Sequence, residues 1–463
     1  MIQKKPKDIL NYYFIGIGGI GMSALARYFK AVGKLVSGYD KATSPITDAL
    51  IQEGCSIDFN GAVSNLPDAF INPSETLVVY TPAVSDAHPQ LQYFKENGFE
   101  ILKRSEALGL ITRSKKALCV AGTHGKTTTS AMLAHVLNQT RHKCSAFLGG
   151  ISSNFNSNVV ISGSSEWTVV EADEIDRSFL HLSPHSSIVT AMDPDHLDIY
   201  GDDERFNEGF QQYAMKIDPN GFCIIKEGLQ LHALCPSYTY NIDSDTADYS
   251  ASGIAYENGE MVFYVQTGQN RSLRYTLGIP GIHNVLNALG CIVLLEKIGL
   301  TYPDIKRGLA SFKGVKRRFD THIKTDDLVY IDDYAHHPEE LKLLIDSIQM
   351  MFPEKKVIAI FQPHLYSRTK DFGSGFGEQL SRFDELYLLP IYAAREDEII
   401  GISSDWLLSK VDLKEKRVVE STMVLELMKK TKEGVVLTIG AGDIDRMVEP
   451  LVKILNENIT ESI

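Results

Sequence analysis

A short glycine-rich turn followed by Lys-Thr is the part of this sequence best suited to catalysis. It consists of Gly122, Thr123, His124, Gly125, Lys126, Thr127 and Thr128. The apolar run Ala117 to Ala121 precedes it, and helical apolar spacing continues to Leu137. A strand, a glycine turn and a helix in this order surround a phosphate with backbone N–H groups and the positive end of a helix dipole. Lys126 would then contact the β- and γ-phosphates, and the Thr127 hydroxyl would be a ligand for Mg²⁺.

A second glycine motif lies near the N-terminus. Its residues are Gly16, Gly18, Gly19, Ile20 and Gly21. The apolar run Tyr12 to Ile15 precedes the motif, helical spacing from Met22 to Val32 follows it, and Asp40 comes after the next predicted strand. This pattern fits a dinucleotide-binding fingerprint, in which glycines let the backbone approach a pyrophosphate. By itself it suggests NAD or FAD, but the diphosphate of another nucleotide would suit the same turn.

Acidic residues follow two further predicted strands of the central part of the chain. Glu171, Asp173 and Glu174 come directly after the run Trp167 to Val170. A carboxylate in this position, one strand beyond a phosphate loop, is well placed to bind Mg²⁺, and Glu171 is nearest the strand. His196 follows the next strand in an Asp-rich segment. Histidine is unusual for Mg²⁺, so His196 could hold a second cation or be structural.

Two more polar segments leave predicted strands of the last third of the chain. One contains Asp333, His336 and His337, and the other contains His364 and Arg368. Ligands of open parallel sheets bind outside the carboxyl ends of the strands, so both segments are candidates for substrate binding. The adjacent histidines have no third ligand at a useful spacing, which argues against zinc.

Alternating strand and helix patterns that position these motifs fall into three blocks and predict an α/β fold with parallel sheets. We expect a Rossmann-like domain at 1–110, a central P-loop ATPase-like domain at 111–312 and a C-terminal Rossmann-like domain at 313–463. Residues 254–265 could form a β-hairpin beside the central sheet. A helix is predicted from Asn284 to Ile298 and another from Pro338 to Met350.

The composition excludes several classes of protein. With 463 residues the chain is too long for one core, and its net charge of −13 argues against nucleic-acid binding. No apolar run is long enough to span a membrane, and the N-terminus lacks the apolar stretch of a signal peptide. The six cysteines are scattered without a CxxC pair, which is typical of reduced core residues in a cytoplasmic protein. We expect a monomer or a homodimer.

Taken together, the motifs resemble those of the Mur ligases. The resemblance covers nearly the whole chain in the same order and rests on eight segments: 16–23, 122–129, 171–179, 193–198, 283–288, 317–319, 332–338 and 362–364. It implies ATP-dependent ligation of L-alanine to the lactyl carboxylate of UDP-N-acetylmuramate, in the synthesis of peptidoglycan precursors. The carboxylate would be phosphorylated to an acyl phosphate, which the amine then attacks. ATP and Mg²⁺ or Mn²⁺ are the implied cofactors.

The resemblance also implies a role for individual residues. The UDP-sugar would bind to the loop from Gly16 to Gly21, with Asp40 and Thr81. ATP would bind to the loop from Gly122 to Thr128 and to Asn284, Asn287, Arg318 and Asp333. The metal sites would involve Thr127, Glu171 and His196. The amino acid would bind through His337, His364 and Arg368, and catalysis would depend on Lys126, Glu171, His196, His364 and Arg368.

Three positions depart from the pattern expected for alanine-adding members of the family. Leu365 stands where we expect Arg, Tyr39 where we expect Ser, and Pro82 within a segment where Ser-Ser-Ala is usual. The first departure concerns the amino-acid carboxylate, and the other two concern contacts to the nucleotide-sugar. Three alternatives remain: a ligase that adds a preformed murein tripeptide to the same UDP-sugar, an NAD-dependent oxidoreductase, and a nucleotide switch without chemistry.

Overall fold

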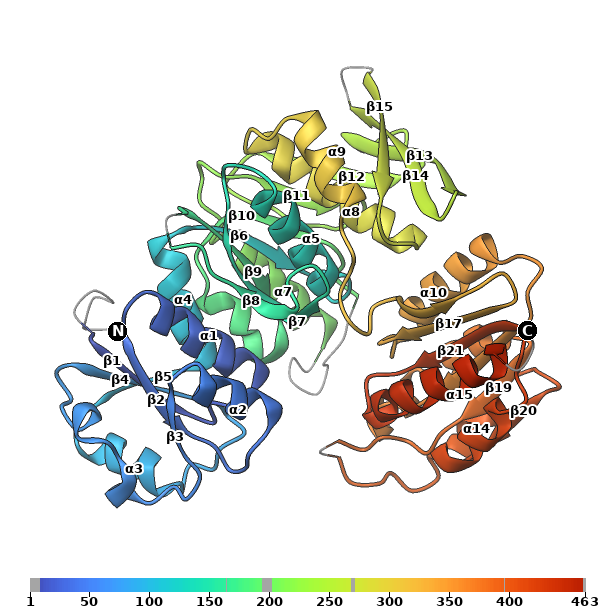
Figure 1. Cartoon of the computed structure of the whole chain (residues 1–463). Coiled ribbons are helices and arrows are strands. Elements are labelled where there is room, and N and C mark those ends of the chain that lie inside the picture. The colour runs from blue at the N-terminus through green and yellow to red at the C-terminus, as the bar shows by residue number, and fades with distance from the viewer. Residues whose placement is uncertain (1–8, 164, 194–201, 268–270, 395, 461–463) are drawn as a thin grey trace. The chain divides into compact units, whose positions relative to one another are not determined.

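A computed structural model describes residues 9–163, 165–193, 202–267, 271–394 and 396–460. Three sheets follow one another along the chain, and Figure 1 colours them from blue through green to red. The chain divides into two compact units, which we call unit 1 (residues 1–251, 265–273 and 287–312) and unit 2 (residues 252–264, 274–286 and 313–463). The α/β class with three sheets is confirmed.

The first sheet has five parallel strands in the order β3-β2-β1-β4-β5, as in a Rossmann-like fold. Its elements are β1 (Asn11–Ile15), α1 (Ile20–Ala31), β2 (Leu35–Tyr39), α2 (Pro45–Gln52), β3 (Ser56–Asp58), η1 (Val63–Asn65), η2 (Asp68–Phe70), β4 (Thr76–Tyr80), α3 (Pro89–Glu96), β5 (Glu100–Lys103) and α4 (Arg104–Ser114). The glycine motif connects β1, which is buried throughout, to α1.

The central sheet has ten strands in the order β15-β14-β13-β12-β11-β10-β6-β9-β7-β8. Its elements are β6 (Lys116–Ala121), α5 (Lys126–Asn138), β7 (Ser145–Ser152), β8 (Ser157–Val160), β9 (Trp167–Ala172), η3 (Ile175–His181), β10 (Pro184–Val189), α7 (Asp203–Ala214), β11 (Cys223–Lys226), β12 (Ser237–Ile242), β13 (Tyr249–Glu257), β14 (Glu260–Thr267), β15 (Arg271–Leu277), α8 (Ile282–Lys297) and α9 (Tyr302–Ala310). The predicted hairpin is formed by β13 and β14, which turn at Asn258 and Gly259, both with positive φ.

The third sheet has six strands in the order β16-β17-β21-β18-β19-β20. Its elements are β16 (Asp320–Lys324), β17 (Leu328–Asp333), α10 (Pro338–Met351), β18 (Val357–Phe361), α11 (Tyr366–Asp371), α12 (Gly373–Leu380), β19 (Glu385–Leu388), α13 (Ser404–Leu408), β20 (Lys416–Val418), α14 (Ser421–Met428), β21 (Gly434–Ile439), η4 (Asp443–Met447) and α15 (Val448–Thr460). Separate apolar clusters, one containing Leu341 and Phe376 and the other Val424 and Leu455, form the core around this sheet.

Apart from the predicted hairpin, two further strands depart from the expected parallel arrangement. In the central sheet β8 runs antiparallel to β7, and in the third sheet β16 runs antiparallel to β17. Only a few residues join each pair, whereas a parallel pair needs a crossover of a dozen or more residues. The central sheet is therefore mixed.

The first sheet and the central sheet share a core within unit 1. The ring of Tyr28 on α1 lies 5.3 Å from that of Phe147 on β7, and Asn158 Nδ2 donates a hydrogen bond of 2.9 Å to the carbonyl oxygen of Ile20. Residue 110, the predicted end of the first domain, lies inside α4. The division into three domains at 110 and 312 stays a prediction.

Two further expectations concern cysteines and membranes. All six cysteines are buried free thiols, as predicted. Among the described residues, no helix is long and apolar enough to cross a membrane.

Candidate active site

The phosphate loop joins β6 to α5 through two glycines with positive φ. Gly122 has φ 135° and Gly125 has φ 80° and caps α5. A Cβ atom at Gly122 would lie 2.3 Å from Thr190 Oγ1, so no other residue fits there. Thr190 Oγ1 donates a hydrogen bond to the carbonyl oxygen of His124. The loop is thus held against the end of β10, with its glycines where backbone conformation and space both demand them.

Lys126, at the first position of α5, is part of a buried ion pair. Its Nζ atom lies 2.7 Å from Glu174 Oε2 and donates a 2.6 Å hydrogen bond to the carbonyl oxygen of Gly122. Burial by itself would lower the pKa of Lys126, but nearby carboxylates, Glu174 foremost, raise it above the ordinary value. Lys126 therefore stays charged at the mouth of the loop.

Glu171 connects the loop to the end of β9. Its Oε1 atom accepts a 3.0 Å hydrogen bond from the Thr127 hydroxyl, and its Oε2 atom accepts one of 2.9 Å from the backbone N–H of Gly149. Burial raises the pKa of Glu171, and the charge of Lys126 opposes this only in part. The predicted proximity of Thr127 and Glu171 is what the structure shows.

The charges around the loop fit an additional cation. The charge of Asp173 also acts on this cluster and raises the pKa of both Glu171 and Lys126. Three carboxylates thus share one buried ammonium group. A hydroxyl beside a carboxylate is the set of oxygen donors that Mg²⁺ takes in phosphate-loop proteins. Among the described residues, no three His, Cys, Asp or Glu side chains form a ready metal cluster, so a bound metal would need oxygens from ATP or water.

Two asparagines of α8 are among the residues predicted to bind ATP. Asn287 lies against the phosphate loop, since a Cβ atom at Gly125 would be 2.6 Å from its Oδ1 atom. Asn284 donates a 2.6 Å hydrogen bond to the carbonyl oxygen of Pro280. His124 lies 3.7 Å from Asp193. His196 lies outside the described residues.

The N-terminal glycine loop is braced by Asp40. The backbone N–H of Gly18 donates a 2.7 Å hydrogen bond to Asp40 Oδ2. A Cβ atom at Gly16 would be 2.5 Å from Thr81, and one at Gly21 would be 2.9 Å from Arg104. The loop therefore has close neighbours on three sides. The structure brings Gly16, Gly18, Asp40 and Thr81 together at the ends of β1, β2 and β4.

In unit 2, Asp333 holds the backbone near the start of β16 and after the end of β17. Its carboxylate accepts hydrogen bonds from the backbone N–H groups of Phe319, at 2.7 Å, and Ala335, at 2.8 Å. Burial raises the pKa of Asp333 to about 6. The Cζ atom of Arg318 lies 4.6 Å from the centre of the Tyr334 ring, and its Nη1 atom lies 3.8 Å from Glu340 Oε1. Asp333 thus holds the backbone directly after Arg318, at Phe319, and the backbone after β17, at Ala335.

The predicted amino-acid residues lie at the carboxyl ends of β17 and β18. His364 Nδ1 lies 3.2 Å from Arg368 Nη1, and the buried guanidinium group is carried by α11. His337 caps α10, because its Nδ1 atom accepts a hydrogen bond of 3.4 Å from the N–H of Glu339. Leu365, between His364 and α11, has φ 68°, which is unusual for a residue other than glycine.

Sequence reasoning missed three parts of this site. Glu174 was one of three acids that could bind the metal, with Glu171 preferred, and only the structure pairs Glu174 with Lys126. Thr190, directly after β10, fixes the loop, and the N–H of Gly149 on β7 orients Glu171. A polar residue at the end of a buried strand was the available signal for Thr190, whereas a backbone N–H leaves no signal in a sequence.

Comparison with known families supports this interpretation of the site. The Mur ligase family catalytic domain matches residues 11–116, the Mur ligase middle domain matches 120–295, and the Mur ligase glutamate ligase domain matches 317–442. The chain belongs to the Mur ligase family. The three matches follow one another without overlap and contain all the candidate residues, from Gly16 to Arg368.

Individual Mur ligases are similar over the full chain. UDP-N-acetylmuramate–L-alanine ligase from Phocaeicola vulgatus is 47% identical over 96% of this chain and 98% of that protein. The enzyme of the same name from Flavobacterium psychrophilum is 48% identical over 97% and 99%. The crystal structure of UDP-N-acetylmuramate-alanine ligase from Thermotoga maritima matches with a TM-score of 0.77 and 30% identity, over 98% of this chain and all of that one.

A murein peptide ligase from Psychrobacter arcticus has the same fold. Its structure matches with a TM-score of 0.65 at 20% identity, over 96% of this chain and 98% of that one. This match shows the fold alone.

Proposed function

We propose that this Mur ligase joins L-alanine to the lactyl carboxylate of UDP-N-acetylmuramate at the expense of ATP, as a step in peptidoglycan precursor synthesis. The observation that carries the proposal is identity of 45–48% over nearly the full length to enzymes named for this reaction. The buried cluster of Lys126, Thr127, Glu171 and Glu174 supplies chemistry of the required kind.

The first step is phosphorylation of the carboxylate. A carboxylate oxygen attacks the γ-phosphorus of ATP, and ADP leaves. Two anions must approach each other, so positive charge is needed between them. Lys126 would exchange part of its contact with Glu174 for phosphate oxygens, while backbone N–H groups at the start of α5 bind the same phosphates. Thr127 and Glu171 would hold Mg²⁺, which neutralises phosphate charge when bound.

The second step forms the amide bond. The amine of alanine attacks the acyl carbon, the carbon–oxygen bond to phosphate breaks, and the amine loses a proton. Phosphate leaves with the former carboxylate oxygen. We assign the amino-acid carboxylate to Arg368, whose planar guanidinium group can bind both oxygens, with His364 orienting that group. His337 would complete the amino-acid site.

The remaining substrate contacts follow from the two loops. The loop from Gly16 to Gly21, braced by Asp40, would bind the diphosphate of the UDP-sugar. Asn284 and Asn287 would bind the adenine, and Arg318 and Asp333 would act on ATP from the third domain. His196 would be a further metal ligand.

Phosphate release tests the proposal. Purified protein with ATP, Mg²⁺ and UDP-N-acetylmuramate should release phosphate when L-alanine is added and form the alanyl product, detected by mass spectrometry. L-Ala-γ-D-Glu-meso-diaminopimelate, the tripeptide substrate of the competing reaction, should give at most about a hundredth of that rate. A higher rate with the tripeptide than with L-alanine would replace the proposed function by murein tripeptide ligation.

A further inference from the structure

A cavity of about 460 Å³ lies in unit 1 at the amino ends of β6 and β10. The two strands are parallel neighbours, with Ala117 opposite Pro184. The phosphate loop begins after Ala121, at the other end of β6. Five residue steps of about 3.3 Å separate the two ends, so the cavity is roughly 17 Å from the loop. It is therefore separate from the site described above.

The lining of this cavity is basic in an acidic protein. Arg113, Lys115, Lys116 and Lys216 line it, with Asp218 as the one carboxylate among the lining residues, whereas the chain carries a net charge of −13. A basic pocket in an acidic chain attracts anions selectively.

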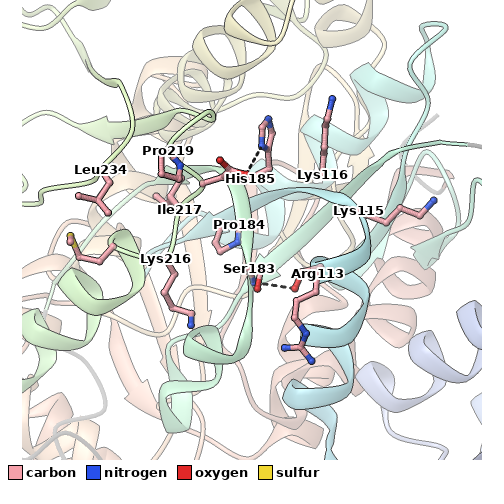
Figure 2. Close-up of a pocket in the computed structure, with 13 residues that line it drawn as sticks. Arg113, Lys115, Lys116, Ser183, Pro184, His185, Lys216, Ile217, Pro219 and Leu234 are labelled. Carbon is pink, nitrogen blue, oxygen red and sulfur yellow. Dashed lines mark hydrogen bonds and ion pairs between the residues drawn. The ribbon is translucent and has the colours of Figure 1, made fainter. Parts of the chain in front are cut away.

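Two of these cationic side chains already contact other groups of the protein. Lys115 Nζ donates a 2.6 Å hydrogen bond to the carbonyl oxygen of Ser165, and Lys116 Nζ lies 3.0 Å from Glu166. The side chains of Arg113 and Lys216 make no hydrogen bond or ion pair with any described residue. Figure 2 shows both extending on the same side of the pocket, one on each side of Ser183.

Helix dipoles do not explain why the Arg113 and Lys216 side chains border the same cavity. Arg113 lies in the last turn of α4, and Lys216 follows the end of α7, so each gains from the dipole of its own helix. That gain does not require the two side chains to border one cavity. An anionic group between them would receive two charge-assisted contacts.

Two large apolar side chains of the lining, Met215 and Leu234, are exposed. Met215 is 46% exposed and Leu234 is 61% exposed, and the lining also includes Pro219 and the buried Ile217. Large exposed apolar side chains that border one cavity indicate a ligand with an apolar part. A volume of about 460 Å³ is within the range of small-molecule sites.

We propose that this cavity binds a phosphate monoester of an apolar or aromatic group, with the phosphate between Arg113 and Lys216 and the apolar group on Met215 and Leu234. This site is independent of the proposed ligase function, because it shares no residue with the substrate sites.

Isothermal titration with 1-naphthyl phosphate tests the site. ADP and UDP are present at saturation so that the nucleotide sites are occupied. The protein should bind one equivalent. Arg113→Gln together with Lys216→Gln should weaken binding about 10-fold or more, because hydrogen bonds to charged groups contribute roughly 1.5–3 kcal/mol each. The Arg113 and Lys216 side chains are both exposed, so their replacement should leave the fold intact. Unchanged ligase turnover would show that the double variant is folded.

Matched controls separate this site from general attraction of anions. Lys115→Gln removes the same charge from the same cavity, but that ammonium already binds Ser165, so the affinity should fall less than about 3-fold. Inorganic phosphate and 1-naphthol, each with half of the ligand's features, should bind more weakly. No binding to the native protein, or equal binding to the native protein and the double variant, would overturn the proposal.

Discussion

Lys126 begins α5 with its ammonium group held by Glu174 and by the carbonyl oxygen of Gly122. The glycine motif predicted the position of this lysine, but three acids within four residues made Glu174 indistinguishable from its neighbours. In the structure, Glu174 and Glu171 have different partners. Glu174 pairs with Lys126, whereas Glu171 accepts hydrogen bonds from the Thr127 hydroxyl and from the backbone N–H of Gly149. The carboxylate beside Thr127 is therefore the one to which we assign the proposed metal.

Replacing Glu171 by Gln tests that assignment. The change removes a charge but keeps the shape, and the single amide oxygen can accept from Thr127 or from Gly149 but not from both. We expect the rate of ligation to fall about 100-fold or more, with little recovery at high Mg²⁺. The measurement is phosphate release as a function of Mg²⁺ concentration.

Asp173→Asn is the matched control for this variant. It removes the same charge from the same segment, but the Asp173 carboxylate accepts a hydrogen bond from the N–H of Ile175 instead of binding Thr127. Its rate should fall less than about 10-fold. If Glu171→Gln keeps a normal rate and a normal Mg²⁺ requirement, Glu171 does not hold the metal.

The candidate site residues lie at the ends of strands, and this location could be predicted from the sequence. The two glycine loops lie where predicted, because a glycine-rich turn between a buried strand and a helix is typical of a phosphate-binding loop. The helices α5, α8 and α10 begin and end within about two residues of their predictions. The turn at Leu365 could not be foreseen, since nothing about leucine indicates a positive φ. Its conformation sets the start of α11 and hence the position of Arg368.

Strain at Leu365 predicts an unusual order of stability. Both Leu365→Gly and Leu365→Ala remove the side chain beyond Cβ, but only glycine adopts φ 68° without strain. Strain of this kind costs about 1–3 kcal/mol, and the flexibility of glycine in the unfolded chain offsets about 0.4–1 kcal/mol. We expect the Gly variant to be more stable than the Ala variant by about 1 kcal/mol in denaturant unfolding.

Lys370, exposed in α11, provides the opposite comparison. There Lys370→Ala should be more stable than Lys370→Gly by about 1 kcal/mol, because alanine favours a helix. An Ala variant at 365 as stable as the Gly variant would show that Leu365 is not strained.

The length of the chain predicted more than one domain, and the structure contains three sheets. Each of the first two sheets carries one glycine loop. What sequence could not supply is how the first two sheets pack. Tyr28 and Phe147 are ordinary apolar residues in their own elements, yet their contact joins α1 to β7 in one core. Strands β8 and β16 were also missed, because short polar edge strands lack the apolar runs that mark buried strands.

The proposed reaction as a whole requires that ATP phosphorylates the substrate carboxylate. UDP-N-acetylmuramate labelled with ¹⁸O in its lactyl carboxylate, turned over with ATP, Mg²⁺ and L-alanine, measures this directly by mass spectrometry of the released phosphate. The oxygen that attacks the γ-phosphorus leaves with it, so each phosphate should carry one ¹⁸O atom, and ADP should carry none. Unlabelled phosphate, or label in AMP, would contradict an acyl phosphate formed at the Lys126 loop.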